Sequence, residues 1–382
     1  YPPDKGDKVR SYHLLRHRAV LEHLAQTGRG PRARRLALLA WQGGNAAYLR
    51  AALHPDEQAW LEHVATIDRN QLPDRLRLNL PEWLAERLQA QLGESFVPVV
   101  KALEQPAPLD LRVNTFKARR EAVLAELAQL GHEAEATPFS PWGIRLHSKP
   151  ALHKVELFLR GDVEVQDEGS QLLALITDAH RGEMVADFCA GAGGKTLALG
   201  AAMRNTGRLY AFDTSGHRLA ALKPRLARSG LSNVYPIQIA HERDERIKRL
   251  AGKLDRVLID APCSGLGTLR RNPDLKWRQS PESVAELVAK QTAILNSAAR
   301  LVKPGGRLVY ATCSLLQEEN EAIAQAFGSA TERDFDVLPA VEALERAGAS
   351  SGDRLIDGPY LRLWPDRHLT DGFFAAVWQR RG

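Results

Sequence analysis

Cysteine is scarce in this sequence: three occur in 382 residues, at positions 189, 263 and 313. A small, odd number of cysteines in a chain of this length argues against a disulfide framework and for a reducing compartment. Apolar runs of about 18 residues, long enough to cross a membrane, are absent as well. Internal repeats and low-complexity segments are also missing. We therefore expect ordinary globular domains in the cytoplasm, without membrane association.

Positive charge is concentrated near the start of the chain. The net charge is +6, and residues 1–60 hold ten Lys and Arg side chains against five Asp and Glu. Such asymmetry indicates a polyanionic partner, although a solvated basic helical surface gives the same pattern.

The chain, at 382 residues, is longer than one average domain, and its length predicts two or three domains. Because the chain begins at Tyr1 and not with methionine, we expect further residues upstream. Residues 1–100 are predicted to be helical, since leucines recur at helical spacing from Leu14 onward and Pro81 begins another helix.

The pattern changes twice after this helical region. Residues 101–165 predict a small α+β module, with strands at 109–114 and 143–146 and a helix at 119–130 between them. In residues 166–382 strands and helices alternate, which predicts a Rossmann-like, doubly wound α/β sheet with right-handed crossovers.

Two cysteine-bearing turns follow apolar stretches that are typical of buried parallel strands. They are residues 260–264 (Asp-Ala-Pro-Cys-Ser) and 310–314 (Tyr-Ala-Thr-Cys-Ser). Ligands of such sheets bind beyond the carboxyl ends of the strands, so both cysteines are expected where chemistry would occur. A thiolate is a strong nucleophile, and Asp260 is a possible acid or base beside Cys263. The alternative is that both cysteines are small packing residues at strand ends.

A glycine turn at residues 187–196 (Asp-Phe-Cys-Ala-Gly-Ala-Gly-Gly-Lys-Thr) follows another strand and begins a helix. A phosphate-binding loop would need glycine where Cys189 stands, and a dinucleotide fingerprint would need glycine where Thr196 stands. A nucleoside cofactor without pyrophosphate remains, with Asp213 at the end of the next strand for its ribose hydroxyls. S-adenosylmethionine fits this description; a generic tight turn and a surface aspartate are the alternative.

Several motifs together resemble one family. Six segments resemble motifs of the Sun (Fmu) family. They are the first cysteine turn with its continuation to Trp277, residues 304–320 around the second turn, the glycine turn, and residues 111–114, 166–171 and 371–374. These are the NOP2/Sun-type RNA cytosine-5 methyltransferases. The resemblance extends from about residue 106 to the C-terminus.

The resemblance implies a role for each residue of the cysteine turns. Cytosine C5 is too weak a nucleophile to attack a methyl sulfonium unaided. In this family a thiolate adds to C6, and by resemblance that nucleophile is Cys313. Asp260 then hydrogen-bonds or protonates N3, and Cys263 assists release of the covalent intermediate. The target base must leave its stack, and this costs less free energy in unpaired RNA, so unpaired RNA is the expected substrate.

Further site residues follow from the same resemblance. Contacts to S-adenosylmethionine are expected from Cys189, Ala190, Gly191, Ala192, Gly193, Gly194, Lys195, Asp213, Arg218 and Asp260, and no metal is expected. Lys195 orients the cofactor carboxylate or caps a turn. RNA contacts are expected from Arg112, Asn114, Arg270, Arg271, Lys276 and Trp277, with a solvated loop as the alternative for the last four.

The sequence departs from the family at two places in this site. Ala192 stands where the family usually has proline. Ala240 stands where an aspartate usually lies near the adenine, and Glu242 or Asp244 could substitute.

The resemblance also implies the remaining domains and the partner. The α+β module is expected to be RRM-like, and the helical leader resembles a shortened NusB-like RNA-binding domain. We expect a monomer that acts on 16S ribosomal RNA, free or partly assembled. The alternatives are the same reaction on tRNA and a non-catalytic RNA-binding or ribosome-assembly factor. Methylation of an exocyclic amine is disfavoured, because Cys263 replaces the aromatic ring that such enzymes stack on the base.

Overall fold

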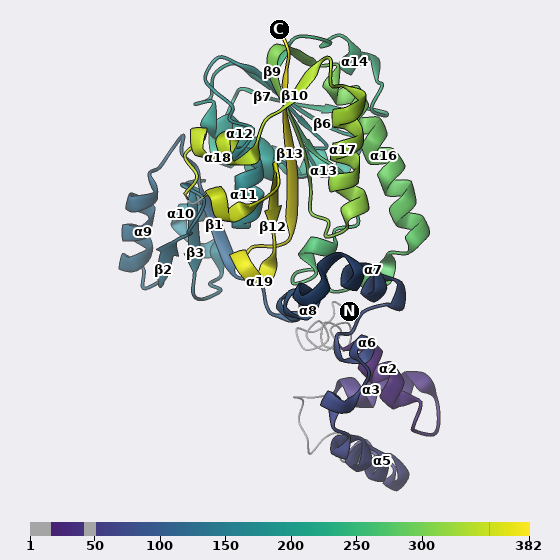
Figure 1. Ribbon diagram of the computed structural model, residues 1–382. Helices are drawn as coiled ribbons and strands as arrows, with labels where there is room; N and C mark the ends of the chain where they lie inside the picture. Colours follow the sequence, from purple (N-terminus) through teal and green to yellow (C-terminus); the bar gives the residue numbers. More distant parts are fainter. Residues whose placement is uncertain (1–16, 42–50, 351) are drawn as a thin grey trace. The chain divides into compact units, whose positions relative to one another are not determined.

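The computed structural model describes residues 17–41, 51–350 and 352–382 (Figure 1). Leu14, at the start of the first predicted helix, lies outside them. The chain divides into two compact units. The first comprises Tyr1–Gln105 and Leu269–Ser280, and the second comprises Pro106–Thr268 and Pro281–Gly382.

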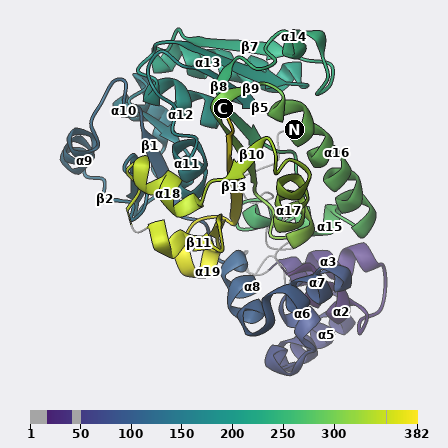
Figure 2. The ribbon, with the colours of Figure 1, turned by 45° about the horizontal axis from the view of Figure 1, so that its top comes forward.

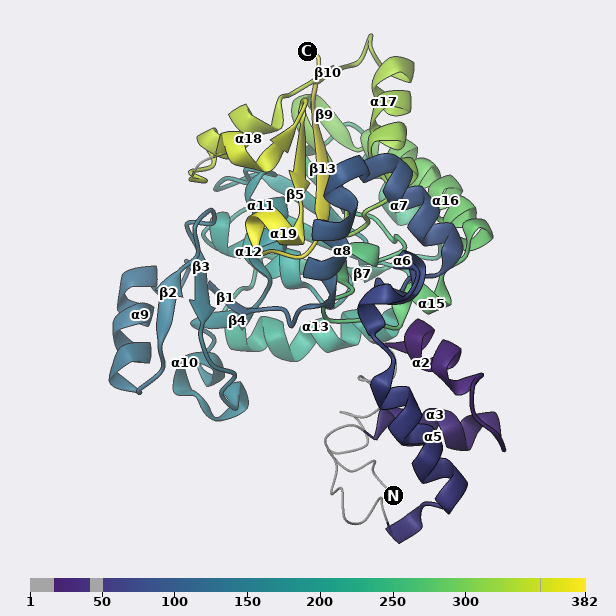
Figure 3. The same ribbon diagram turned by 60° about the horizontal axis from the view of Figure 1, so that its bottom comes forward.

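The first unit is helical. Leucines and valines on one face of its first helices form a common core, which includes Leu21, Leu39 and Val64. Figure 3 shows these helices beside one another. The α-helices of the unit are α2 (Arg18–Ala25), α3 (Arg32–Ala40), α5 (Pro55–Thr66), α6 (Asp74–Arg77), α7 (Glu82–Leu92), α8 (Phe96–Glu104) and α15 (Leu275–Arg278).

Helix α15 reaches this unit from far along the chain. A small hollow is lined by Leu269, Pro273 and Lys276 of this later segment and by Val100 and Leu103 of α8. The segment 269–280 therefore packs with the helical unit, although the sequence places it inside the α/β region. The helical unit also extends to Gln105, a few residues beyond the expected boundary.

The second unit begins with the α+β module. Its elements are β1 (Leu109–Val113), α9 (Arg120–Gln129), β2 (Ala134–Ala136), β3 (Gly143–Leu146), α10 (Glu156–Leu159) and β4 (Val163–Val165). The antiparallel sheet has the order β2-β3-β1-β4, which with this chain order is the ferredoxin-like arrangement shared with RRM domains. Leu111, Val113 and Ile144 face Val123 and Leu127 of α9, so the helices cover one face of the sheet.

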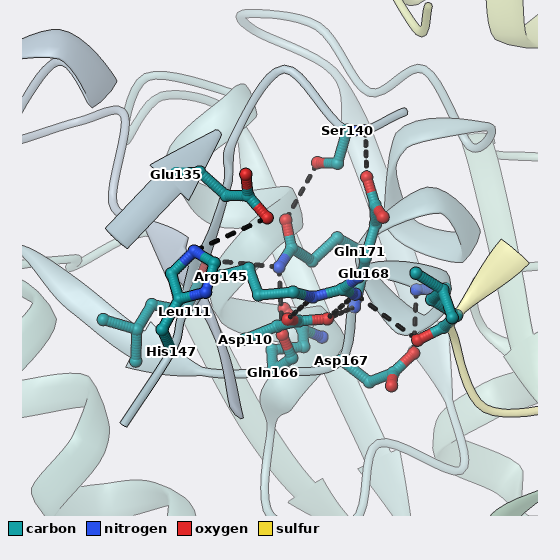
Figure 4. Close-up of polar contacts among 12 residues, drawn as sticks. Asp110, Leu111, Glu135, Ser140, Arg145, His147, Gln166, Asp167, Glu168 and Gln171 are labelled. Carbon is teal, nitrogen blue, oxygen red and sulfur yellow. Dashed lines mark hydrogen bonds and ion pairs between the residues drawn. The ribbon is translucent and has the colours of Figure 1, made fainter. Parts of the chain in front are cut away.

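The other face of this small sheet carries charged residues, and it is buried. Arg145 donates to both oxygens of Asp110 at 2.8 and 2.9 Å, and Asp110 also accepts the backbone N–H of Glu168 at 3.2 Å (Figure 4). Glu168 accepts the N–H groups of Phe139 and Ser140, both at 2.7 Å. These contacts fix the module to the first helix of the α/β domain, α11 (Glu168–Leu175).

Arg112 and Asn114 belong to the same junction. The Arg112 guanidinium donates to Gln166 at 2.6 Å, and its burial lowers the pKa of Arg112 to about 10. Asn114 donates to the carbonyls of Gly161 and Ser229 at 2.9 and 3.0 Å. Both side chains are buried. The structure thus corrects the expectation of RNA contacts from these two residues: an RNA strand cannot reach them in the free protein.

The large sheet has the order β11-β12-β13-β9-β8-β5-β6-β7, with β10 paired to β13. Its parallel part runs from β9 to β7, and β10 to β13 pair antiparallel. The strands are β5 (Met184–Phe188), β6 (Arg208–Asp213), β7 (Val234–Gln238), β8 (Leu254–Asp260), β9 (Val302–Thr312), β10 (Phe335–Val337), β11 (Ile356–Asp357), β12 (Tyr360–Leu363) and β13 (Phe373–Arg380).

Helices cover both faces of this sheet, as the strand-helix alternation predicts. One apolar core joins the sheet to α11, α12 (Gly194–Ala202), α13 (Gly216–Ser229) and α18 (Ala340–Arg346). The second core joins it to α14 (Glu245–Lys248), α16 (Pro281–Ala299) and α17 (Glu321–Ala330). Figures 1 and 2 show α16 and α17 on the opposite side of β13 from α11 and α18. A short α19 (Pro365–His368) precedes β13.

The strand order reverses between β5 and β8, and this topological switch point determines where a ligand can bind. The glycine turn follows β5, and the two cysteine turns follow β8 and its neighbour β9. The predicted sheet therefore brings all three motifs to one edge. No helix among the described residues is long and apolar enough to cross a membrane.

The buried Asp110–Arg145 pair gives a direct test of the junction. We expect Asp110→Ala to lower the free energy of unfolding by about 3–5 kcal/mol, because it leaves a largely buried guanidinium without its carboxylate. The matched control is Asp336→Ala, which breaks an Asp–Arg pair that is more than half exposed and should cost less than about 1 kcal/mol. Urea unfolding of both variants measures the difference; equal losses would contradict the structural role of the junction.

Candidate active site

A cavity of about 790 Å³ opens where β5, β6, β7, β8 and β9 end. Its volume lies in the range of small-molecule and cofactor sites. Its walls include the three expected catalytic residues, Asp260, Cys263 and Cys313, and nine of the ten expected cofactor residues. The sequence-based site is thus assembled in one place.

Gly193 is the expected cofactor residue that does not line the cavity. Its φ is +82°, and a Cβ atom there would lie 2.2 Å from Leu222 Cδ1. Glycine at this position is therefore required for close packing of the turn against α13. Gly191, with φ +57°, donates its N–H to Asp213 at 2.8 Å, so Asp213 both faces the cavity and holds the turn in place.

Lys195 and Asp260 form an ion pair at 2.7 Å that links the glycine turn to the end of β8. Burial by itself lowers the pKa of Lys195, but the charge and hydrogen bond of Asp260 outweigh it and raise the pKa above its ordinary value. Lys195 therefore stays charged within the cavity, beside the position where the sequence predicts the cofactor and the base.

The two cysteine sulfurs lie 3.4 Å apart, within hydrogen-bond range. The hydrogen bond to Cys313 and burial raise the pKa of Cys263 well above its ordinary value, and the charges of Cys313 and Glu319 add to this. Cys263 therefore retains its proton. The third cysteine, Cys189, packs against the second core, and burial raises its pKa as well. The two turns thus bring two thiols together at the ligand edge, and a catalytic role for them stays a prediction.

A buried carboxylate holds the two cysteine turns together. Glu319 Oε1 accepts the N–H of Ser264 at 2.8 Å and the side-chain amide of Gln291 at 2.9 Å. Glu319 Oε2 accepts the hydroxyl of Ser264 at 2.5 Å and that of Ser314. Each cysteine is followed directly by one of these serines. Sequence reasoning assigned Glu319 no role, since its place in the second motif says nothing of what its side chain contacts.

The two candidates for the missing aspartate lie just after β7 and differ in position. Ala240 and Glu242 line the cavity, and Asp244 does not. The Asp244 carboxylate accepts the N–H of Ala240 at 2.9 Å and pairs with Arg246 at 2.8 Å; the Arg246 contact and these hydrogen bonds lower its pKa. Of the two, Glu242 therefore lies at the cavity wall, and its contact with the cofactor stays a prediction. Ser170 and Lys290 also line the cavity and were not expected.

The expected RNA residues near α15 lie in the helical unit. Arg270 and Lys276 are buried, Arg271 and Trp277 are half-buried, and the Arg18 guanidinium lies 4.9 Å from the centre of the Trp277 ring. These residues are not part of the cavity, and their contact with RNA stays a prediction.

Comparison with known proteins now identifies the family. Residues 174–379 match the model of the 16S rRNA methyltransferase RsmB/F family, and residues 80–153 match the ferredoxin-like domain of RsmF/B-like methyltransferases. The chain belongs to the RsmB/F family. This confirms the resemblance, the Rossmann-like fold with its small α+β module, and S-adenosylmethionine as the cofactor.

Individual relatives agree with this placement. The chain is 36% identical to a probable ribosomal RNA small subunit methyltransferase B of Synechocystis, over 81% of this chain and 69% of the relative. It is 34% identical to ribosomal RNA small subunit methyltransferase B of Salmonella arizonae, over 78% of this chain and 65% of that one. The chain thus spans about two thirds of the length of these relatives.

Solved structures support the same fold. The crystal structure of PH0851 superimposes with a TM-score of 0.83 at 28% identity, covering 98% of this chain and 89% of that chain. A methyltransferase homologue from Pyrococcus horikoshii superimposes with a TM-score of 0.68 at 30% identity, covering 83% of this chain and 100% of that chain.

The position of Glu242 predicts an effect on cofactor affinity. We expect Glu242→Gln to weaken binding of S-adenosylmethionine about tenfold, since a hydrogen bond to a charged group contributes about 1.5–3 kcal/mol. Asp244→Ala, which removes a helix cap, should instead lower stability by about 1 kcal/mol. Calorimetric titration and thermal unfolding of both variants separate the two effects. Unchanged affinity in Glu242→Gln would remove Glu242 from the cofactor site.

The Glu319 contacts predict an effect on thiol chemistry. Glu319→Gln keeps the shape of the side chain but removes its charge, so the pKa of Cys263 should fall and its alkylation by iodoacetamide should begin at lower pH. The neighbouring Glu318→Gln is the control and should leave the pH profile unchanged. Mass spectrometry of the Cys263 peptide gives the rate; identical profiles in the two variants would contradict the electrostatic role of Glu319.

Proposed function

We propose that this chain methylates C5 of a cytosine in RNA, and that the RNA is 16S ribosomal RNA. The observation that carries the proposal is the pair of cysteine sulfurs 3.4 Å apart, in one cavity with the Lys195–Asp260 pair and the glycine turn. Family membership supports a methyltransferase that acts on ribosomal RNA.

The cavity fits S-adenosylmethionine. The glycine turn offers backbone groups at the N-terminus of α12, Asp213 offers a carboxylate for the ribose hydroxyls, and Glu242 lies at the wall where the adenine is expected. When bound there, S-adenosylmethionine supplies an electrophilic methyl group. The cavity extends beyond this wall to the two cysteines, which leaves room for a flipped base.

The chain's own residues activate the base. The Cys313 thiolate adds to C6 of the cytosine, forming a carbon–sulfur bond and moving an electron pair through the ring to C5 and N3. Asp260 contacts N3, and the Lys195 ammonium beside it holds a proton that can pass through Asp260 as negative charge develops on N3. The C5 carbon then carries enough electron density to accept a methyl group.

Release requires the reverse of the addition. The proton taken up at N3 returns to the Asp260–Lys195 pair as methyl transfer restores the double bond to N3. A base then removes the C5 proton, the carbon–sulfur bond breaks, and the electron pair of that bond returns to the Cys313 sulfur. The Cys263 sulfur lies 3.4 Å from that sulfur, so a protonated Cys263 can donate a hydrogen bond that stabilises the thiolate as it leaves.

Two cysteine substitutions test this division of roles. Cys313→Ala should abolish methyl transfer while binding of S-adenosylmethionine stays near normal. Cys263→Ala should slow release, so that a covalent RNA–protein adduct accumulates on a denaturing gel. Cys189→Ala is the matched control and should do neither. Methyl transfer by Cys313→Ala would overturn the proposed nucleophile, and the absence of a long-lived adduct would overturn the role of Cys263.

The RNA itself is identified in cells. Bisulfite sequencing of total RNA from cells with and without the gene should show one or more 16S cytosines that lose protection when the gene is removed. Loss of protection in tRNA would support the same reaction on another RNA. If no site changes and calorimetry detects no binding of S-adenosylmethionine, the chain is a non-catalytic RNA-binding or assembly factor.

A further inference from the structure

A second cavity, of about 410 Å³, lies in the α/β unit away from the active site. Residues of the loop between β1 and α9, the residue before β3, and Arg204 just after α12 form its walls. Of the described residues that line the two cavities, none is shared. Helix α12 separates them: its first residue lines the active site, and nine residues of helix cover about 13 Å.

Positive charge dominates this second cavity. Lys117, Arg119, Arg120 and Arg204 line it, and among the described lining residues one, Glu121, is acidic. The Glu121 carboxylate is 79% exposed and lies 3.8 Å from Arg120. The cavity therefore keeps a net positive charge that an anion can neutralise.

Backbone carbonyls hold three of these four cations in place. Lys117 donates to the carbonyls of Arg160 and Arg228 at 2.6 and 2.8 Å. Arg204 donates to the Thr115 carbonyl at 2.6 Å, and Arg120 donates to the Ser140 carbonyl at 3.0 Å. A neutral acceptor fixes a cation without cancelling its charge, so these side chains are ordered in advance for an anionic ligand. Each guanidinium has further N–H groups for a phosphate.

Two aromatic side chains line the same cavity. Phe116 is 38% exposed, which is unusual for a phenylalanine in this chain, and Trp142 is half-buried against the core of the α/β domain. A free inorganic anion would gain nothing from these rings. A nucleotide would, because its base stacks on an aromatic face while its phosphate meets arginine.

The geometry points to a nucleotide subsite for single-stranded RNA: we propose that an unpaired base stacks on Phe116 or Trp142 while Arg119, Arg120 and Arg204 hold the adjoining phosphates. This inference rests on the proposed action on RNA and extends it to a segment away from the target cytosine. The usual base-stacking face of an RRM-like sheet is buried here by Asp110, Arg112 and Arg145, so the edge loops of the module are what remains accessible.

The test measures RNA affinity in two variants that leave the fold and the active site intact. Phe116→Ala should weaken binding of a labelled single-stranded RNA at least about fivefold, since stacking on one ring contributes about that much or more. It should leave affinity for a duplex of the same sequence unchanged, because paired bases stay stacked. Arg119→Gln should weaken binding of both RNAs and reduce the slope of log affinity against log salt by about 0.7 for the single strand.

Matched controls come from the same unit. Tyr235→Ala removes an aromatic side chain that is 45% exposed on β7, and Arg300→Gln removes an exposed arginine that is held by a backbone carbonyl. Neither should change RNA affinity. In Phe116→Ala and Arg119→Gln, kcat at saturating RNA and affinity for S-adenosylmethionine should equal those of the unsubstituted protein, while KM for RNA rises.

The outcomes separate this inference from the proposed function. If the unsubstituted protein methylates RNA but Phe116→Ala and Arg119→Gln bind it as well as the controls do, the subsite is overturned and the function stands. If the unsubstituted protein neither binds nor methylates RNA, the proposed function fails first. If inorganic phosphate binds at the cavity but RNA affinity is unchanged in the variants, the cavity is a small-anion site and the proposal is wrong.

Discussion

The buried Glu319 carboxylate is the contact on which the active site depends. The sheet fixes the ends of β8 and β9 as neighbours, but the turns beyond a sheet edge lose the ladder hydrogen bonds that would hold them. Burying a carboxylate costs several kcal/mol unless its oxygens are satisfied. Here four donors satisfy it, and they come from both cysteine turns and from α16. The cost of burial is thus offset only when the two turns lie in one arrangement, and that arrangement sets the distance between the sulfurs.

A second constraint comes from the charged face of the small sheet. Glu164 pairs with Arg225 and Arg228 of α13, and Arg225 also donates to the carbonyl of Ala192 in the glycine turn at 2.7 Å. Arg112 is linked to the cavity by a chain of hydrogen bonds: Arg112 donates to Gln166, and Gln166 donates to Ser170, which lines the cavity. The module therefore supports the cofactor side of the active site while Glu319 supports the cysteine side. Polar residues on this sheet therefore make contacts inside the protein, where Asp110, Arg112 and Glu164 are buried.

The sequence predicted what local patterns encode. Apolar runs located β5, β6, β8 and β9, and the glycine turn and the two cysteine turns followed from them, because parallel strands must end at one edge. It could not show that segment 269–280 packs with the N-terminal helices, since contacts between distant segments leave no local periodicity. It misplaced Arg112 and Asn114 because a polar residue in a strand has the same sequence pattern whether its face meets water or another domain. Glu242 and Asp244 are two residues apart in the sequence, and only the structure shows that Glu242 lines the cavity while the Asp244 carboxylate caps a helix.

The two cysteines show how far identical sequence context can diverge in chemistry. Each follows a parallel strand and precedes a serine bound to Glu319, so backbone geometry alone would make them equivalent. The charged groups around the two cysteines differ in sign. Lys195 and Cys313 line the same cavity, and the charge of Cys313 is among the causes that raise the pKa of Lys195. The hydrogen bond to Cys313 and burial raise the pKa of Cys263 well above its ordinary value, and nearby negative charge such as that of Glu319 adds to this, so Cys263 keeps its proton. Two turns of like backbone geometry thus have unlike electrostatic surroundings, because negative groups act on Cys263 while a buried ammonium shares the cavity with Cys313.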